Sequence, residues 1–350
     1  MHSLPSFVHH ISAQSLPELL QRMPKAELHM HIEGSLEPEL MFAMAARNGV
    51  VLPYPSVQAL REAYVFDNLQ SFLDIYHAGT LVLKTEQDFY DMASAYMARA
   101  QADQVLHAEI FFDTQTHTGH GLSAEVVING LHRACADAQA RFGMTASLIL
   151  CFLRHLSEAE AFECLEQALP LRDKILGIGL ASSEVGHPPE KFARVFARAR
   201  ELGFRLVAHA GEEGPPAYIW SALDVLKVER IDHGVRAVED VALMQRLVQD
   251  RIPLTVCPLS NLKLRVVDTL AQHPMQRLLQ AGIMATVNSD DPAYFGGYLN
   301  ENFTQTFAAL PLTAAHAYTL ARNSFDASFI DEGARHAHVA RLDALFESFA

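Results

Sequence analysis

The chain has 350 residues, of which 50% are hydrophobic and 19% charged, and this composition excludes a mainly disordered protein. Lys and Arg number 27 against 41 acidic residues, and a net charge of −14 argues against general nucleic-acid binding. No apolar run approaches the roughly 20 residues of a membrane span, and Met1–Leu20 lacks the pattern of a signal peptide.

Short apolar segments alternate with longer amphipathic ones, which predicts a parallel sheet with helical crossovers. We predict one domain over 1–350, because no low-complexity run or Gly/Ser linker divides the chain. The predicted strands are Ala26–Ile32, Val105–Phe111, Thr145–Cys151, Ile175–Leu180, Phe204–His209, Arg230–His233, Pro253–Cys257 and Ile283–Val287. The predicted helices are Ser123–Arg141, Ser157–Leu169, Pro189–Leu202, Pro216–Leu226, Val238–Gln249 and Pro274–Ala281. Gly143, Gly203 and Gly282 follow three of these helices, as is typical of helix ends.

This alternation predicts an α/β protein of the (β/α)8 (TIM) barrel type, which takes about 250 residues. The additional length follows the first strand, over roughly residues 37–104, far more than the dozen or so that a crossover needs. Met41–Arg47 and Asp88–Ala102 have the pattern of helices there, and such helices would cover the C-terminal mouth of the barrel. The alternative is an open doubly wound sheet, which predicts a Gly-rich phosphate loop after an early strand, and none is present.

Histidines and carboxylates gather at the predicted C-terminal ends of four strands. They are His29 and His31 on the first strand, His209 and Glu212 after the fifth, Asp232 and His233 after the sixth, and Asp290 and Asp291 after the eighth. His29 and His31 lie two apart on a strand, so their side chains point to one face. A single pair of histidines is explained equally well by core packing, but barrel enzymes place catalytic groups at these strand ends. Imidazoles with a carboxylate are a natural ligand set for zinc, so we predict a metal site at the mouth.

These motifs resemble those of the adenosine/adenine deaminase family, a branch of the metal-dependent amidohydrolases with a (β/α)8 fold. The resemblance extends from Pro24 to the helices after Asp291. It rests on H-x-H in the first strand, H-A-G-E at the fifth, D-H-G at the sixth, V-C-P-x-S at the seventh and S-D-D-P at the eighth. It implies a hydrolytic enzyme that releases ammonia from C6 of a purine.

The resemblance also implies a role for each matching residue. The implied ligands of one zinc ion are His29, His31, His209 and Asp290, although Fe²⁺ and Mn²⁺ accept the same ligand types. Glu212 corresponds to the acid that protonates purine N1, His233 to the histidine beside the metal-bound water, and Asp291 to the residue that hydrogen-bonds N7. Zinc makes hydroxide available near neutral pH, and a proton on N1 favours attack of that hydroxide on C6. An acid needs a raised pKa to hold its proton, so we expect Glu212 to be buried.

Two departures from the family pattern concern the substrate. Glu33 and Ser182 stand where adenosine deaminases usually have Asp and Gly, and both add bulk where a ribose would lie. The segment from Asp291 to Tyr298 is similar to the adenine-specific branch. We therefore predict conversion of adenine to hypoxanthine and ammonia, with N6-substituted adenines as further candidate substrates. The alternatives are adenosine deamination, amide or phosphoester hydrolysis on the same fold, and a non-catalytic purine-binding protein.

An apolar face is predicted within the long insertion. Leu69, Phe72, Leu73 and Tyr76 are spaced as one side of a helix. Core packing explains this spacing as well as an apolar lid over the substrate does.

The remaining expectations concern partners and compartment. The expected partner is a small purine base, with no nucleic acid and no membrane, and a homo-oligomer is left open. The four cysteines, at positions 135, 151, 164 and 257, form no C-x-x-C pair. Scattered cysteines are typical of a reducing compartment, and we expect a cytoplasmic protein.

Overall fold

The computed structural model describes residues 4–350 and contains a sheet of eight parallel strands that follow one another in chain order. The strands are β1 Lys25–His31, β2 Val105–Phe112, β3 Thr145–Leu153, β4 Gly177–Ala181, β5 Arg205–Ala210, β6 Arg230–His233, β7 Leu254–Val256 and β8 Ala285–Val287. The ring closes between β8 and β1 through the backbone of Asp290. Its N–H donates to His29 O (3.1 Å) and its carbonyl accepts from His31 N–H (2.8 Å). The predicted (β/α)8 fold is confirmed.

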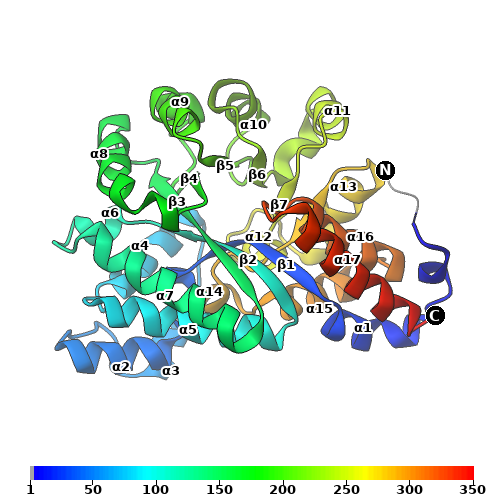
Figure 1. Ribbon diagram of the computed structural model, residues 1–350, viewed down its shortest axis with the longest axis horizontal. Helices are drawn as coiled ribbons and strands as arrows, with labels where there is room; N and C mark the ends of the chain where they lie inside the picture. Colours follow the sequence, from blue (N-terminus) through cyan, green and yellow to red (C-terminus); the bar gives the residue numbers. More distant parts are fainter. Residues whose placement is uncertain (1–3) are drawn as a thin grey trace.

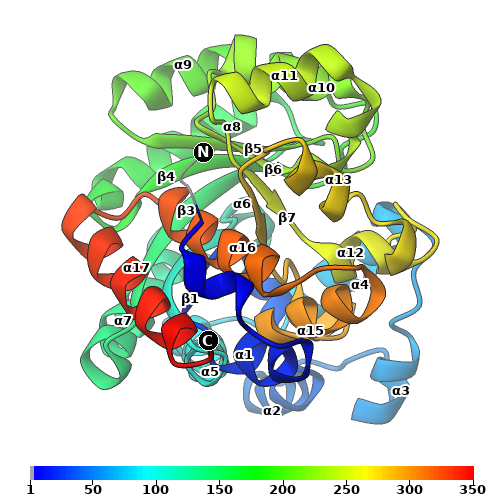
Figure 2. The same ribbon diagram turned by 90° about the vertical axis from the view of Figure 1, so that its right-hand side faces the viewer.

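Helices surround the strands on the outside of the barrel (Figures 1 and 2). Those after β2 are α6 Gln115–Thr118, α7 Ala124–Phe142, α8 Glu158–Ala168, α9 Ala193–Glu201, α10 Pro216–Ser221, α11 Val241–Gln249, α12 Pro258–Lys263, α13 Met275–Gln280, α14 Pro292–Phe295, α15 Leu299–Ala309, α16 Ala314–Asp326 and α17 Glu332–Glu347. Short 3-10 helices are η1 Ser6–His9, η2 Ala13–Ser15, η3 Glu33–Ser35, η4 Leu169–Lys174, η5 Pro189–Phe192, η7 Val235–Glu239 and η8 Leu270–Gln272, and η6 Ala222–Leu226 is a π-helix. In residues 4–350 no helix combines the length and apolarity needed to cross a membrane.

The insertion after β1 is helical, as predicted. It contains α2 Pro38–Asn48, α3 Val57–Glu62, α4 Leu69–Thr80 and α5 Glu86–Ala102, whereas α1 Leu16–Arg22 precedes β1. The side chain of Asn68 accepts from Ser71 N–H at the start of α4, and Thr85 does the same for Asp88 at the start of α5. The sequence predicted α2 and α5 as segments and the apolar face of α4, whereas α3, with six residues, was not predicted.

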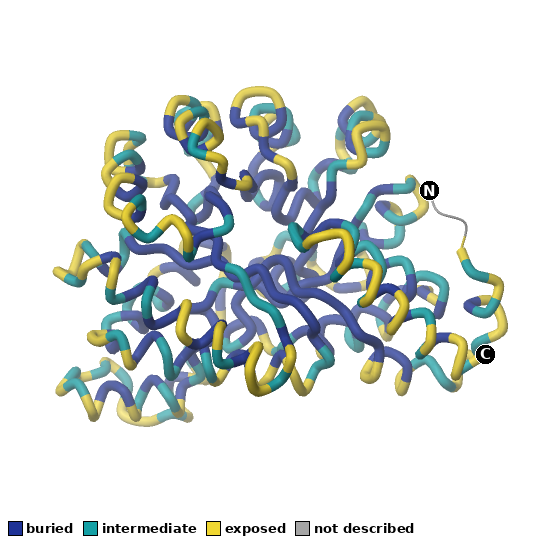
Figure 3. The backbone as a smooth tube through the Cα atoms, viewed as in Figure 1, coloured by how far each residue is buried: buried dark blue, intermediate teal, exposed yellow. Residues whose placement is uncertain are grey.

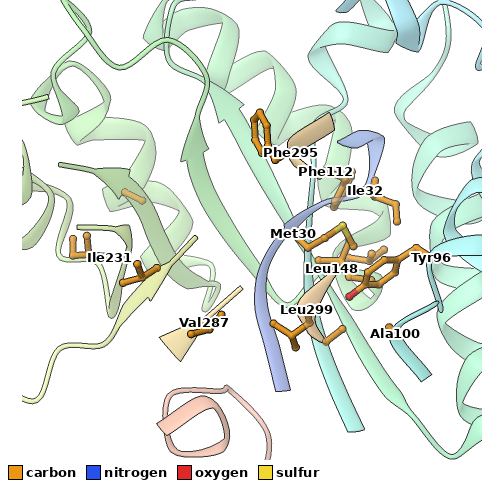
Figure 4. Close-up of a cluster of buried hydrophobic side chains, with 14 of the residues drawn as sticks. Met30, Ile32, Tyr96, Ala100, Phe112, Leu148, Ile231, Val287, Phe295 and Leu299 are labelled. Atoms are coloured by element: carbon orange, nitrogen blue, oxygen red, sulfur yellow. The ribbon is translucent and has the colours of Figure 1, made fainter. Parts of the chain in front are cut away.

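The two faces of β1 have different roles: one packs in the hydrophobic core, and the other carries two of the predicted metal ligands. Met30 points outward into a buried cluster with Leu148 of β3 and Tyr96 of α5, as Figure 4 shows. Because side chains alternate along a strand, the flanking His29 and His31 point to the barrel axis. Figure 3 shows the strands mostly buried, apart from the first residues of β3 and β5, with most of the exposure on the outer sides of the helices and loops.

A buried ion pair lies inside the barrel. Arg230 Nη1 donates to Glu109 Oε2 (2.5 Å), both side chains are fully buried, and Phe329 N–H donates to Glu109 Oε1 (2.5 Å). Burial raises the pKa of Glu109, but the Arg230 charge, the contact with His107 and the Phe329 N–H together outweigh it and lower that pKa to about 2.

We expect Glu109→Ala to reduce the free energy of unfolding by about 3–5 kcal/mol, because it leaves Arg230 buried without this partner. Urea denaturation measures the change. The control is Glu229→Ala, which removes an exposed pair with Arg205 (2.6 Å) and should cost no more than about 1 kcal/mol. Equal losses in the two variants would contradict the prediction.

Candidate active site

The four predicted metal ligands lie together at the C-terminal mouth of the barrel. Ligand atoms of His29, His31, His209 and Asp290 all lie within 4.8 Å of one another. His31 Nε2 is 3.0 Å from His209 Nε2, and Asp290 Oδ1 is 3.2 Å from His29 Nε2 and 3.6 Å from His31 Nε2. Zinc bonds of about 2.0–2.1 Å in a tetrahedron separate ligand atoms by roughly 3.4 Å. The spacing of this set therefore fits zinc.

Two of these imidazoles are held neutral, as ligands of a cation must be, whereas the nearby charges of Asp290 and Asp232 outweigh burial and raise the pKa of His29. Burial lowers the pKa of His31 to about 4, and burial with the neighbouring histidines holds the pKa of His209 well below its usual range. Among the described residues, Nε2 of buried His29 has no hydrogen-bond partner. Neutral imidazole nitrogens that face one another at 3.0 Å repel unless a proton or a cation lies between them.

Residues behind the ligands orient them. His29 Nδ1 lies 3.1 Å from both O and Oγ1 of Thr255. Thr255 Oγ1 donates to Asp232 Oδ1 (2.9 Å), and Asp232 Oδ2 lies 3.5 Å from His209 Nδ1. Contacts of this kind fix the orientation and tautomer of ligating histidines. The sequence analysis gave Asp232 and Thr255 no role, although Asp232 belongs to the D-H-G motif.

The predicted acid and its neighbouring histidine lie beside the ligand set. His233 Nε2 is 3.5 Å from Glu212 Oε2 and 3.7 Å from Asp290 Oδ2. Burial, reinforced by the Asp290 charge, raises the pKa of Glu212 well above its usual range, as expected for a proton donor. Burial lowers the pKa of His233 to about 3, so this imidazole is neutral and can accept a proton. His233 and Asp290 have φ of 63° and 62°, a backbone strain that often marks functional sites.

A cavity lies over this cluster. Of the predicted substrate residues, those that line it are Asp291, Ser182, Leu69, Phe72 and Leu73. The lining also includes Tyr76 of the predicted apolar face, together with His77, Asp113, Cys151, Leu264 and Phe295, for which no binding role was predicted. The apolar face of α4 is therefore buried, and it also lines the cavity. The ring centroids of Phe72 and Phe295 are 4.6 Å apart.

Two small structural features frame Asp291 and Ser182. A Cβ on Gly34 would lie 1.9 Å from Asp291 Oδ1, so only glycine leaves room for this carboxylate. Ser182 has φ of 79°, a region that favours glycine, and its Oγ lies 2.9 Å from His155 Nδ1. The side chain of Ser182 therefore sits at the cavity wall on strained backbone.

Glu33 does not share the strand face of His29 and His31. β1 ends at His31, and Glu33 begins η3, so the alternation of the strand does not extend to it. Glu33 is not part of the cavity lining. Its buried carboxylate lies 3.2 Å from His117 Nε2 and accepts from Tyr76 O–H at 3.4 Å, so it reaches the cavity through Tyr76.

Glu184 holds the turn that carries Glu212. Its Oε1 accepts from Gly211 N–H (2.6 Å), and its Oε2 accepts from the N–H groups of Glu212 (3.1 Å), Glu213 (2.8 Å) and Gly214 (2.7 Å). The sequence analysis gave no role to Glu184, because these contacts join the ends of two strands that are adjacent only in the fold.

Comparisons with known proteins agree with this geometry. A family model described as adenosine deaminase matches residues 24–345. A protein named adenine deaminase from Albidiferax ferrireducens is 77% identical over 339 residues, covering 97% of this chain and 98% of the relative. Another of that name from Trichlorobacter lovleyi is 64% identical and covers 96% and 97% of the two chains. The crystal structure of adenine deaminase from Arthrobacter aurescens superposes with a TM-score of 0.91 at 52% identity, covering 92% of this chain and 98% of that one.

Proposed function

The chain belongs to the adenosine deaminase family, and from this premise and the site geometry we propose that it hydrolyses adenine to hypoxanthine and ammonia. One observation carries the proposal: Glu212, with its raised pKa, and Asp291 line one cavity with the ligand set. A purine presents N1 and N7 on either side of C6, and these two carboxyl groups suit those two atoms. Relatives named adenine deaminase, at 77% and 64% identity, support the free base as substrate.

We assign zinc to the set of His29, His31, His209 and Asp290. A solved amidohydrolase from Burkholderia ambifaria, 26% identical with a TM-score of 0.87, carries bound zinc, which supports this choice. When bound, zinc supplies a water that ionises near neutral pH. Fe²⁺ or Mn²⁺ would suit the same ligand types.

The residues around the substrate divide the remaining work. Glu212 donates its proton to N1, which removes the resistance of the aromatic ring to attack at C6. Neutral His233 accepts a proton from the attacking water. Asp291 hydrogen-bonds N7 and fixes the ring, while Leu69 and Phe72 of α4 exclude bulk water from the cavity. His233 returns its proton to the amino group, which leaves C6 as ammonia, and the C6 hydroxyl gives its proton back to Glu212 to form hypoxanthine.

Ammonia release from adenine, adenosine, AMP and N6-methyladenine, with metal analysis of the same sample, tests the proposal. We expect adenine to be preferred over adenosine by 10⁴-fold or more, the discrimination typical of a site that hydrogen-bonds the missing group. Comparable turnover of adenosine would identify an adenosine deaminase. A metal-loaded protein that binds purines without turnover would identify a binding protein.

Glu184→Ala should lower kcat for adenine about 10²-fold, because misplacing a catalytic group by 1 Å can cost that much. Without this acceptor the turn from Gly211 to Gly214 loses four hydrogen bonds, and Glu212 moves with it. Steady-state kinetics measures the effect. Ser183→Ala is the neighbouring control, since its exposed Oγ bonds only to Gln70 Oε1 (2.8 Å) and its kcat should be normal. Unchanged kcat in Glu184→Ala would show that the turn keeps its shape unaided.

A further inference from the structure

Asp113 lines the cavity but has no part in the mechanism above. It directly follows β2, is 5% exposed and lies at the cavity wall. Within residues 4–350, its carboxylate has one hydrogen bond, in which Oδ1 accepts from Thr116 N–H (2.7 Å). His117, on the same short helix as Thr116, lies against Glu33 instead. Asp113 therefore presents an acceptor to the cavity.

Among the other ionisable groups of the lining, Tyr76 donates to Glu33, and His77 has no hydrogen bond to Asp113 within residues 4–350. His31, His209 and Asp290 belong to the ligand set, and Glu212, His233 and Asp291 act on the purine. A carboxylate only accepts hydrogen bonds, and its burial is costly unless donors satisfy it. Asp113 therefore calls for a ligand that brings an N–H group to this wall.

Given the proposed function, the order of the strands indicates which atom of adenine carries this N–H group. C6 lies at the ligand set, N1 toward Glu212 after β5, and N7 toward Asp291 after β8. From β8 the barrel continues through β1 to β2, which pair side by side (Figure 1), and so to Asp113. From β5 it runs back to β4 and Ser182. On the purine, N9 lies beyond N7 and N3 beyond N1, so Asp113 faces N9 and Ser182 faces N3.

We propose that Asp113 accepts the hydrogen bond of the adenine N9–H and thereby makes the site specific for the free base. Adenosine carries its ribose on N9, so it lacks this donor and would leave the buried carboxylate without a partner. Such a loss is the kind of difference that discriminates by 10⁴–10⁵, whereas added bulk alone discriminates far less. Asp113, rather than Glu33 or Ser182, is thus the residue that determines specificity for the free base.

The test compares adenine with 9-methyladenine, which differs at N9 only, in wild type and in Asp113→Asn and Asp113→Ala. Hydrogen bonds to charged groups have a strength that corresponds to about 10- to 150-fold in kcat/KM. We expect Asp113→Ala to lose that factor for adenine and to gain activity toward 9-methyladenine, because the variant no longer leaves a buried carboxylate without a partner. Asp113→Asn keeps a neutral acceptor and should fall between. The ratio of the inhibition constants of hypoxanthine and 9-methylhypoxanthine should shift in the same order.

Asp74→Asn is the matched control, because Asp74 is an exposed residue of α4 and the change in net charge is the same. It should leave both substrates unaffected. Equal losses for adenine and 9-methyladenine, or no loss for adenine, in Asp113→Ala would overturn the assignment of Asp113. Wild-type protein that turns over adenosine as well as adenine would instead overturn the proposed function, whatever the variants do.

Discussion

Asp290→Ala is expected to lower the metal content of the protein and to abolish adenine turnover together. Asp290 is the one carboxylate of the proposed ligand set, and its Oδ1 lies between His29 Nε2 (3.2 Å) and His31 Nε2 (3.6 Å). Its removal leaves three neutral imidazoles, with no anionic ligand to offset the charge of the metal. Elemental analysis of the purified variant, beside ammonia release, measures both effects.

The backbone at Asp290 calls for a second variant and a control. Because φ is 62°, alanine is strained there, whereas asparagine tolerates this region, so Asp290→Asn separates ligand loss from backbone strain. Lys227→Ala places alanine at φ of 59° outside the site and should retain both metal and activity. A stoichiometric metal load with a near-normal rate in Asp290→Asn would remove Asp290 from the ligand set. A full metal load without turnover would indicate that Asp290 acts on the attacking water and is not needed to hold the metal.

The fold was predictable because each buried strand is a short apolar segment between longer amphipathic segments with helical periodicity. The boundaries were less so. The segment Pro216–Leu226 has one helical pattern, but α10 ends at Ser221 and η6 continues it with π-helical geometry up to Lys227 in the left-handed region. Pro189–Leu202 likewise divides into η5 and α9. Element ends depend on caps and on tertiary packing, neither of which a periodicity records.

Residues of the site were predictable where a motif sits directly at a strand end. His29 and His31 follow from strand alternation, and Asp290 from its place after the last strand. Alternation failed for Glu33, because β1 ends at His31 and a 3-10 turn redirects the chain.

Residues whose role depends on contacts between neighbouring strand ends left no pattern in the sequence. Glu184 follows β4 and binds the turn after β5, and Asp232 of β6 approaches His209 of β5. Asp113 likewise acquires its place only when the barrel closes and sets β2 beside β1. Glu184 and Asp113 belong to no motif in their own segments, and Asp232, although part of the D-H-G motif, acquires its role only through its contacts in the fold.

Glu212→Gln is expected to lower kcat for adenine by about 10²–10⁴-fold, the usual contribution of general acid catalysis. The amide keeps the shape of the side chain but has no carboxyl proton to give to N1. The variant should retain its metal, because Glu212 is outside the ligand set, and it should still bind purines. Steady-state kinetics, metal analysis and inhibition by hypoxanthine measure the three properties.

The pH profile distinguishes loss of an acid from loss of shape. Burial and the Asp290 charge raise the pKa of Glu212 well above its usual range, which favours the protonated carboxyl. Wild-type activity should fall as pH rises through that raised pKa, and this limb should be absent in Glu212→Gln. Glu213→Gln is the adjacent control: its half-buried carboxylate accepts from Leu69 N–H (3.2 Å), outside the cavity lining, and its profile should keep the limb. A Glu212→Gln enzyme within a few-fold of wild type would mean that another group protonates N1.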